Sequence, residues 1–255
     1  MVNTTTSKTK DFMKLLFNDY KNHYLEIRTL SKKNNSTVNR EFIKLEDIET
    51  YSPNLENNVY VGIRPRINKG NGKSYNTAPT KLLWADYDSI EIESPTERYK
   101  ALRERLKALG VPQPNIVINS GKGLHTYWIM DKDIEDPTPI LRHLAEKTGA
   151  DIKATDKARI LRLPNTFNHK YGIAIKVDIL RYNKSDIYPL EYFIKSIGMN
   201  TKGDSLKALQ SDYRDSLKAN KIYNLPKEIN RYPDIKNMLI NGVEKGERNF
   251  ALGRI

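Results

Sequence analysis

The pattern of apolar and polar residues along the first 200 positions predicts interspersed helices and strands. Phe12, Leu15, Leu16 and Tyr20 recur at helical spacing, so we expect an amphipathic helix over residues 8–22. Period-two alternation and short apolar runs predict strands at residues 24–30, 59–63, 82–88, 115–119, 125–130 and 174–180. Further helices are expected at residues 95–109, 138–148 and 190–197, each followed by a glycine. This mixed order is typical of α+β and α/β sheet proteins, and we expect the α+β class.

The pattern changes near the C-terminus. Residues 1–199 are predicted to form one domain, and residues 200–230 are polar enough to be a linker. A new apolar pattern begins in residues 231–255, which contain Ile235, Met238 and Leu239. We therefore expect the start of a further helical domain there.

Composition narrows the kind of partner. The 255 residues include 43 Lys and Arg against 31 Asp and Glu, a net charge of +12, and no cysteine. The absence of cysteine excludes disulfides and Cys-ligated zinc or iron–sulfur sites. No long apolar run or apolar leader is present, so we expect no membrane association and a cytoplasmic location. The positive net charge favours an anionic partner such as nucleic acid. A genome whose proteins are generally rich in lysine would explain the same charge equally well.

Asp86 and Asp88 end an apolar run and are two residues apart. Side chains at this spacing in a strand point to the same face. Paired carboxylates repel each other unless a cation lies between them, and oxygen ligands are those that Mg²⁺ prefers. The pair is therefore a candidate divalent-metal site, whereas the alternative is a solvated strand end.

A glycine-containing turn, Ser120-Gly-Lys-Gly-Leu-His125, lies between two predicted strands. Glycines allow backbone N–H groups to approach an anion, and Lys122 adds a positive charge. The spacing is not that of a Walker loop. We expect phosphate binding by this turn, with a plain glycine-rich hairpin as the alternative.

A third polar segment covers residues 151–170. It combines acids, two arginines three residues apart, and a Pro-Asn turn. Arginine binds phosphate with two parallel hydrogen bonds. Spacing alone does not distinguish a phosphate site from a charged connector.

Taken together and in this order, the three segments resemble the archaeo-eukaryotic primase superfamily, in particular its phage- and plasmid-type primase-polymerases. The segments that carry the resemblance are 85–88 (Asp-x-Asp), 120–125 (Ser-Gly-x-Gly-x-His), 149–151 (Gly-Ala-Asp) and 159–170 (Arg-x-x-Arg-x-Pro-Asn-Thr-x-Asn-x-Lys), the last matching a family pattern with Pro-Gly-Thr at its centre. Residues 61–66 resemble the arginine-bearing strand that precedes the Asp-x-Asp in the family, and residues 246–249 resemble the opening of its C-terminal accessory domain. One departure is Asn165 in place of the family's glycine. Asparagine tolerates a positive φ better than other non-glycine residues, so we expect the turn to be retained.

The resemblance implies an RRM-like antiparallel palm packed on a second αβ module, with a short helical C-terminal extension. It implies template-directed nucleotidyl transfer with two Mg²⁺ or Mn²⁺ ions, in replication of a mobile element. Asp86, Asp88 and Asp151 would hold the ions, and His125 would act with them at the reaction centre. The residues that would bind the nucleotide are Ser120, Gly121, Lys122, Gly123, His125, Arg159, Arg162, Asn168 and Lys170. The implied partners are a single-stranded DNA template, a primer strand and dNTP or NTP, with a helicase in a longer parent chain.

Several alternatives remain open from the sequence. Asp156 and Asp178 compete with Asp151 as the third acid, although Asp151 fits the family's pattern best. A catalytically inert single-stranded-DNA-binding module would share the charge and the aromatic residues. A rolling-circle replication endonuclease would need paired histidines, and no His-x-His is present.

Overall fold

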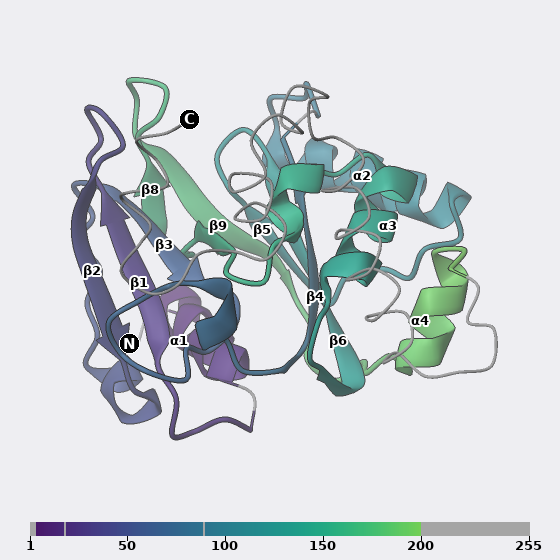
Figure 1. Cartoon of the computed structure of the whole chain (residues 1–255). Helices are drawn as coiled ribbons and strands as arrows, with labels where there is room; N and C mark the ends of the chain where they lie inside the picture. Colours follow the sequence, from purple (N-terminus) through teal and green to yellow (C-terminus); the bar gives the residue numbers. More distant parts are fainter. Residues whose placement is uncertain (1–3, 18, 89, 200–255) are drawn as a thin grey trace, which may run out of the picture. The chain divides into compact units, whose positions relative to one another are not determined.

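The computed structural model describes residues 4–17, 19–88 and 90–199, which form two antiparallel sheets and the helices that cover them (Figure 1). The predicted linker at 200–230 and the predicted helical segment at 231–255 lie outside the described residues. The two sheets are joined through a segment that contributes one short strand to each. This segment is the third polar motif of the sequence.

The four-stranded sheet has the order β2-β1-β3-β7. Its strands are β1 (Leu25–Leu30), β2 (Thr37–Ile43), β3 (Asn58–Gly62) and β7 (Ile160–Arg162). All neighbouring strands are antiparallel, and Tyr60 of β3 lies opposite Arg162 of β7. This register places an aromatic ring and a guanidinium on the same face of the sheet.

The five-stranded sheet has the order β4-β6-β5-β9-β8 and is also antiparallel. Its strands are β4 (Thr80–Tyr87), β5 (Ile116–Asn119), β6 (Leu124–Ile134), β8 (Thr166–Asn168) and β9 (Ile175–Tyr182). Asp86 lies directly opposite His125 in the pairing of β4 with β6. Because successive side chains alternate between faces, Tyr87 points away from Asp86, and its hydroxyl donates to Thr148 at 3.0 Å.

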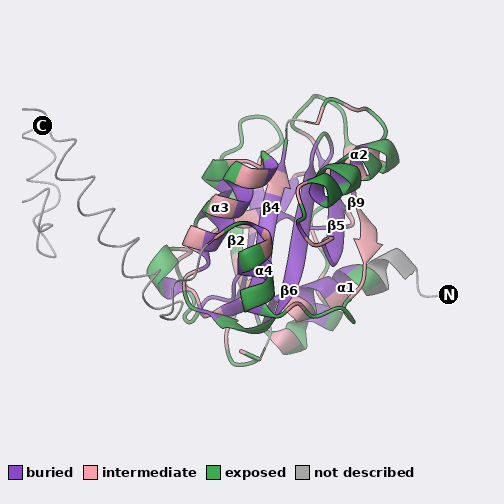
Figure 2. Cartoon of the chain, turned by 90° about the vertical axis from the view of Figure 1, so that its right-hand side faces the viewer, coloured by how far each residue is buried: buried purple, intermediate pink, exposed green. Residues whose placement is uncertain are grey.

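Helices cover both faces of the five-stranded sheet. They are α1 (Thr4–Phe17), α2 (Pro95–Ala108), α3 (Thr138–Thr148) and α4 (Leu190–Ser196), with short 3₁₀ turns η1 (Leu45–Glu49), η2 (Ser74–Asn76) and η3 (Ile152–Thr155). Phe12 of α1 packs edge-on against Tyr127, whereas the next residue, Trp128, packs against Phe193 of α4. Figure 2 shows the buried strands behind α2, α3 and α4, whose outer sides are exposed. Among these described helices, none has the length and apolar character needed to cross a membrane.

Several element boundaries differ from the sequence expectations. The first helix ends at Phe17 rather than at residue 22, and residues 19–23 form turns. Strand β2 was not predicted, because its first four residues are exposed at a sheet edge and show no apolar alternation. Strands β7 and β8 were missed as well, since three residues are too few to establish a period.

The arginine-bearing segment after β3 is structural. Arg66 is fully buried, pairs with the buried Glu26 at 2.8 Å and donates to the carbonyl of Ala158 at 2.9 Å. Arg64 is also buried and donates to the carbonyl of Ala78 at 2.7 Å. These arginines therefore anchor loops, and Arg66 fixes the backbone just before Arg159.

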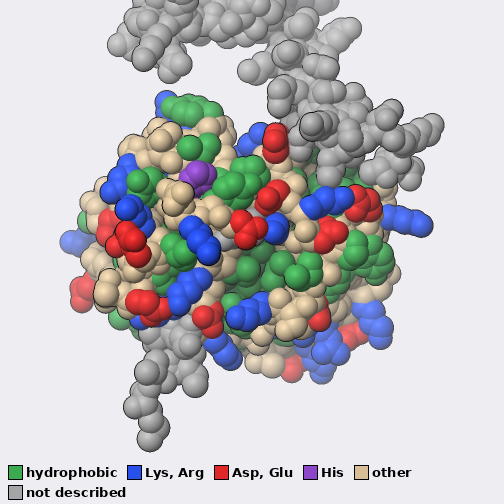
Figure 3. Space-filling view, turned by 90° about the horizontal axis from the view of Figure 1, so that it is seen from below, with side chains coloured by type: hydrophobic (Ala, Val, Ile, Leu, Met, Phe, Trp, Pro, Cys, Tyr) green, Lys and Arg blue, Asp and Glu red, His purple; other side chains and the backbone are tan. Residues whose placement is uncertain are grey.

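Charged side chains of both signs are interspersed over the face shown in Figure 3. No single basic patch covers that face. The net charge of +12 is therefore not by itself evidence for a binding surface there.

Asn165 provides a test of the turn between β7 and β8. Its φ is +60°, and its N–H donates to the carbonyl of Val177 at 2.8 Å. We expect Asn165→Val to lower the free energy of unfolding by about 2 kcal/mol, because a β-branched side chain clashes with the backbone at positive φ. Asn165→Gly is the matched control and should retain the wild-type stability in urea denaturation. Equal stability of both variants would show that the positive φ is not required.

Candidate active site

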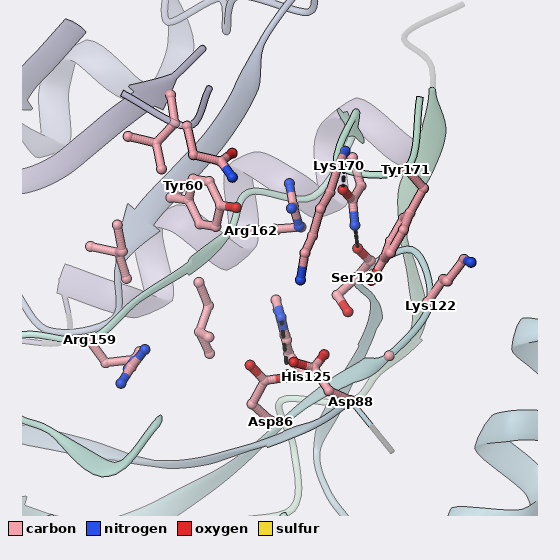
Figure 4. Close-up of a pocket in the computed structure, with 16 residues that line it drawn as sticks. Tyr60, Asp86, Asp88, Ser120, Lys122, His125, Arg159, Arg162, Lys170 and Tyr171 are labelled. Atoms are coloured by element: carbon pink, nitrogen blue, oxygen red, sulfur yellow. Dashed lines mark hydrogen bonds and ion pairs between the residues drawn. The ribbon is translucent and has the colours of Figure 1, made fainter. Parts of the chain in front are cut away.

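A pocket of about 360 Å³ lies between the two sheets (Figure 4). The four-stranded sheet supplies Tyr60 and Arg162, and the five-stranded sheet supplies Asp86, His125 and Asn168. All the residues predicted for the site line this pocket except Asp151 and Gly121. The three sequence motifs therefore meet in one place.

The two acids of the first motif end β4. Asp86 is its penultimate residue and Asp88 follows the strand, so both carboxylates face the pocket as the two-residue spacing predicts. Asp151 lies just outside the pocket lining, and its N–H donates to the carbonyl of Asp86 at 2.7 Å. One oxygen of Asp151 accepts from the N–H of Lys153 at 2.8 Å and caps η3. The third acid is thus held beside the first.

The glycine turn closes tightly against the end of β4. A Cβ on Gly123 would lie 2.6 Å from the carbonyl oxygen of Tyr87 and 2.7 Å from a carboxylate oxygen of Asp88, so only glycine fits. Gly121 has a φ of +116°. The N–H of Ser120 donates to the carbonyl of Gly123 at 3.0 Å. The N–H of Ser120 is therefore engaged within the turn, and Ser120, Lys122 and Gly123 line the pocket.

The third motif lines the opposite wall. Arg162 donates to the amide oxygen of Asn58 at 2.8 Å and lies over the Tyr60 ring, 4.8 Å from its centroid. Asn168 donates to the carbonyl of Ser120 at 2.8 Å and so links this motif to the glycine turn. Arg159 is paired with Asp156 at 2.7 Å. The motif is therefore no solvated connector.

Burial dominates the electrostatics of Asp86. Burial, followed by the charges of Asp88 and Asp151, raises the pKa of this carboxyl to about 7, against the opposing charges of Arg159 and Arg162. One of the Asp86 oxygens, Oδ1, is buried without a hydrogen-bond partner. An unpartnered buried carboxylate oxygen is costly unless a proton or cation neutralises it.

His125 is held neutral. Burial, followed by the charges of Arg162 and Arg159, lowers its pKa to about 3. Its Nε2 lies 3.7 Å from the Asp86 carboxylate, which is a contact between a neutral ring and an acid and not an ion pair. A neutral imidazole has one N–H to donate and one nitrogen that accepts.

The donor set fits a divalent cation. Carboxylate oxygens are the ligands that Mg²⁺ and Mn²⁺ prefer, and Asp86 and Asp88 present them side by side. The orphaned oxygen of Asp86 is what such an ion would satisfy. Over residues 4–17, 19–88 and 90–199, no three His, Asp or Glu side chains are placed to hold one ion together. The fit therefore rests on this pair of acids.

Comparison with curated proteins gives distant relatives, and no protein-family model matches the sequence. A replication protein of Clostridium perfringens is 25% identical over 156 residues, and an uncharacterized protein of Methanocaldococcus jannaschii is 32% identical over 172 residues. These matches cover 58% and 61% of this chain. They cover only 37% and 13% of the relatives, so the chain spans a minor part of the length of either.

Solved structures identify the architecture. The primase-polymerase AEP domain of cyanophage S-2L matches 75% of this chain and 97% of its own, with a TM-score of 0.56 and 16% identity. The catalytic domain of the primase RepB′, solved in complex with initiator DNA, matches 82% of this chain and 98% of its own, with a TM-score of 0.53 and 15% identity. This chain has the archaeo-eukaryotic primase fold. The resemblance drawn from the motifs and the expected α+β class are confirmed at the level of the fold.

Within this primase fold, several residues that shape the pocket were not predicted. Tyr60 and Tyr171 line it, although tyrosines in and near strands look like packing residues from the sequence. Asn58 is fully buried, and its amide oxygen accepts from both Arg162 and the N–H of His169. Arg98 of α2 donates to the carbonyl of Gly121 at 3.3 Å. Their positions depend on tertiary packing, and for Tyr60 and Asn58 on strand register, which the sequence does not reveal.

The third acid can be tested by comparing asparagine variants. If the chain transfers nucleotides as the motif resemblance implies, Asp151→Asn is expected to reduce nucleotide incorporation at least about a hundredfold, because Asp151 is then a cation ligand together with Asp86 and Asp88. Asp156→Asn and Asp178→Asn should stay within severalfold of wild type, because their carboxylates pair with Arg159 and Lys176. Steady-state incorporation on a primed template is the measurement. Inactive Asp156→Asn or Asp178→Asn together with active Asp151→Asn would reassign the third acid.

Proposed function

We propose that this chain is the catalytic domain of a DNA primase-polymerase that transfers nucleotides to a 3′-hydroxyl under the direction of a single-stranded DNA template. The observation that carries the proposal is the pocket itself. In it, two carboxylates at the end of β4 share the lining with Ser120, Lys122 and Arg162. A cation-binding pair beside anion-binding side chains is what nucleotidyl transfer requires, since positioning and charge neutralisation supply most of the catalysis.

The chain's residues have separate tasks in this proposal. Asp86 and Asp88, with Asp151 beside them, would hold two divalent cations. Those ions, when bound, supply neutralisation of the triphosphate and activation of the attacking hydroxyl. The 3′-oxygen forms a bond to the α-phosphorus, the bond to the β-phosphate oxygen breaks, pyrophosphate leaves and the hydroxyl proton passes to solvent.

Side chains from the glycine turn, from β6 and from the third motif hold the triphosphate. Lys122 and Lys170 offer ammonium groups, and Ser120 offers a hydroxyl. His125 donates an N–H as a neutral ring, because its pKa of about 3 keeps it uncharged at neutral pH. Arg162 is held by Asn58 and Tyr60 in a fixed position, so it can neutralise charge on the leaving pyrophosphate without reorganising.

Two further lines support the proposal. The fold is that of a primase-polymerase domain and of a primase solved with initiator DNA, and a curated relative is a replication protein. We extend the proposal to the replication of a phage or plasmid, with Mg²⁺ or Mn²⁺ as the ions. A helicase in a longer parent chain is part of the same proposal.

The test is incorporation of radiolabelled dNTP or NTP on single-stranded DNA, with and without an annealed primer, in Mg²⁺ or Mn²⁺. Products without a primer indicate priming, and extension of the primer indicates polymerisation. Binding of DNA with neither product would favour the inert binding module. Nicking of a duplex origin without incorporation would favour the rolling-circle endonuclease.

A further inference from the structure

An exposed aromatic ring lies at the edge of the candidate active site. Tyr171 is 41% exposed, yet it lines the same pocket as Asp86 and Asp88. Figure 4 shows its ring between Lys170 and Lys122, on the side of the pocket away from Tyr60 and Arg159. Part of this tyrosine is therefore open to solvent at the edge of the pocket.

The backbone that carries Tyr171 is fixed on both sides of the pocket. The preceding N–H groups of His169 and Lys170 donate to the side-chain oxygens of Asn58 and Asn168, at 2.9 and 3.0 Å. Asn168 in turn donates to the carbonyl of Ser120. The backbone from which the ring projects is therefore held next to the glycine turn.

Two cations flank the ring. The Nζ of Lys122 lies 4.3 Å from the ring centroid, within the range of a cation–π contact, and the Nζ of Lys170 lies at 5.6 Å. Lys122 belongs to the glycine turn that we assign to the triphosphate. A flat apolar face with ammonium groups beside it is complementary to a nucleobase whose phosphates lie close by.

We propose that Tyr171 stacks on the nucleobase of the incoming nucleotide, and that Lys122 leaves the ring for the triphosphate when the nucleotide binds. This inference rests on the proposed function and adds to it the site for the base. Before binding, the ammonium of Lys122 covers the ring. The arriving triphosphate attracts the ammonium away, and the freed face takes the base. Stacking of this kind tolerates any base, as a polymerase requires, because every base has a π-face.

The test uses the full 255-residue chain and two probes of the nucleotide site, dATP and inorganic tripolyphosphate, each with Mg²⁺. A single-stranded DNA oligonucleotide is the separate probe of template binding. Tripolyphosphate has no base, so it reports on the phosphate site alone. The variants are Tyr171→Leu, which removes the ring, and Tyr171→Phe, which keeps it. Tyr75→Leu is the matched control, because Tyr75 is also exposed, has Lys73 5.9 Å from its ring centroid and does not line the pocket.

We expect Tyr171→Leu to raise the dissociation constant of dATP about tenfold and to leave that of tripolyphosphate unchanged. Tyr171→Phe should stay within about twofold of wild type for both probes, and so should Tyr75→Leu. Tyr171→Trp gives a second readout, because dATP should quench its added indole emission while tripolyphosphate should not.

Three results would overturn the stacking proposal while the wild-type chain still binds both probes. They are unchanged dATP binding by Tyr171→Leu, an equal loss for both probes, and a loss confined to a single-stranded oligonucleotide, which would assign the ring to the template. A wild-type chain that binds neither dATP nor tripolyphosphate would instead remove the proposed function, and the stacking site with it.

Discussion

Replacing Asp86 with asparagine is expected to stabilise the metal-free protein at pH 8 while it abolishes nucleotide incorporation. The folded-state pKa of Asp86 is about 7, whereas the ordinary value is 3.8. At a pH between these two pKa values, the folded state binds more protons than the unfolded state. The contribution of Asp86 to the free energy of unfolding therefore falls as the pH rises from about 4 to about 7. Asparagine does not ionise and escapes this cost.

The stabilisation should therefore depend on pH in a defined direction. We expect the stability gain of Asp86→Asn, measured by urea denaturation in EDTA, to be about 2 kcal/mol larger at pH 8 than at pH 5. Glu56→Gln is the control, since the Glu56 side chain is 84% exposed and its replacement should be neutral at both pH values. If the gain in stability of Asp86→Asn were the same at pH 5 and pH 8, the pKa of Asp86 would not be raised in the folded state. Added Mg²⁺ should stabilise wild type more than the variant.

Replacing Asp88 with alanine is expected to reduce nucleotide incorporation at least about a thousandfold, equivalent to about 4 kcal/mol of transition-state stabilisation. In the proposed function Asp88 holds a cation, and no other acid replaces it in the pocket lining. Binding of single-stranded DNA should change less than about threefold, because Asp88 is exposed beyond the end of β4 and its loss leaves the core intact.

Two measurements check the second prediction, primer extension for the reaction and fluorescence anisotropy with a labelled oligonucleotide for DNA binding. Glu91→Ala is the matched control, because Glu91 follows in the same segment but does not line the pocket. Glu91→Ala should extend a primer normally. Normal extension by Asp88→Ala would remove the metal assignment, and loss of DNA binding together with activity would indicate a structural effect instead.

Much of the fold could be predicted from local patterns. The helix expected at 138–148 is α3 (Thr138–Thr148), because its apolar spacing is regular and Gly149, at a φ of +72°, ends it. The edge strand β2 could not be predicted, since solvent on its exposed side removes the alternation that identifies a strand. Elements were predicted reliably where one buried face gives a regular spacing of apolar residues. They were missed where no such spacing is present.

The candidate site divides in the same way. The same-face placement of Asp86 and Asp88 follows from strand geometry alone. That Asp86 lies opposite His125, and Tyr60 opposite Arg162, depends on the register between strands far apart in sequence. The resemblance to a primase grouped these motifs before any register was known. It did not indicate Tyr60 or Asn58, because neither belongs to the matched motifs.

The segment that joins β7 to β8 has a mechanical consequence. Only Leu163, Pro164 and Asn165 separate a strand of one sheet from a strand of the other. Proline fixes its own φ, and the N–H of Leu163 is bonded to the carbonyl of Val59 at 3.0 Å. Because this connection is short and stiff, it limits how far the two sheets can move apart. In the proposed function, template, primer and nucleotide would then enter a gap of fixed width, and we expect the two sheets to exclude bulky, distorted base pairs.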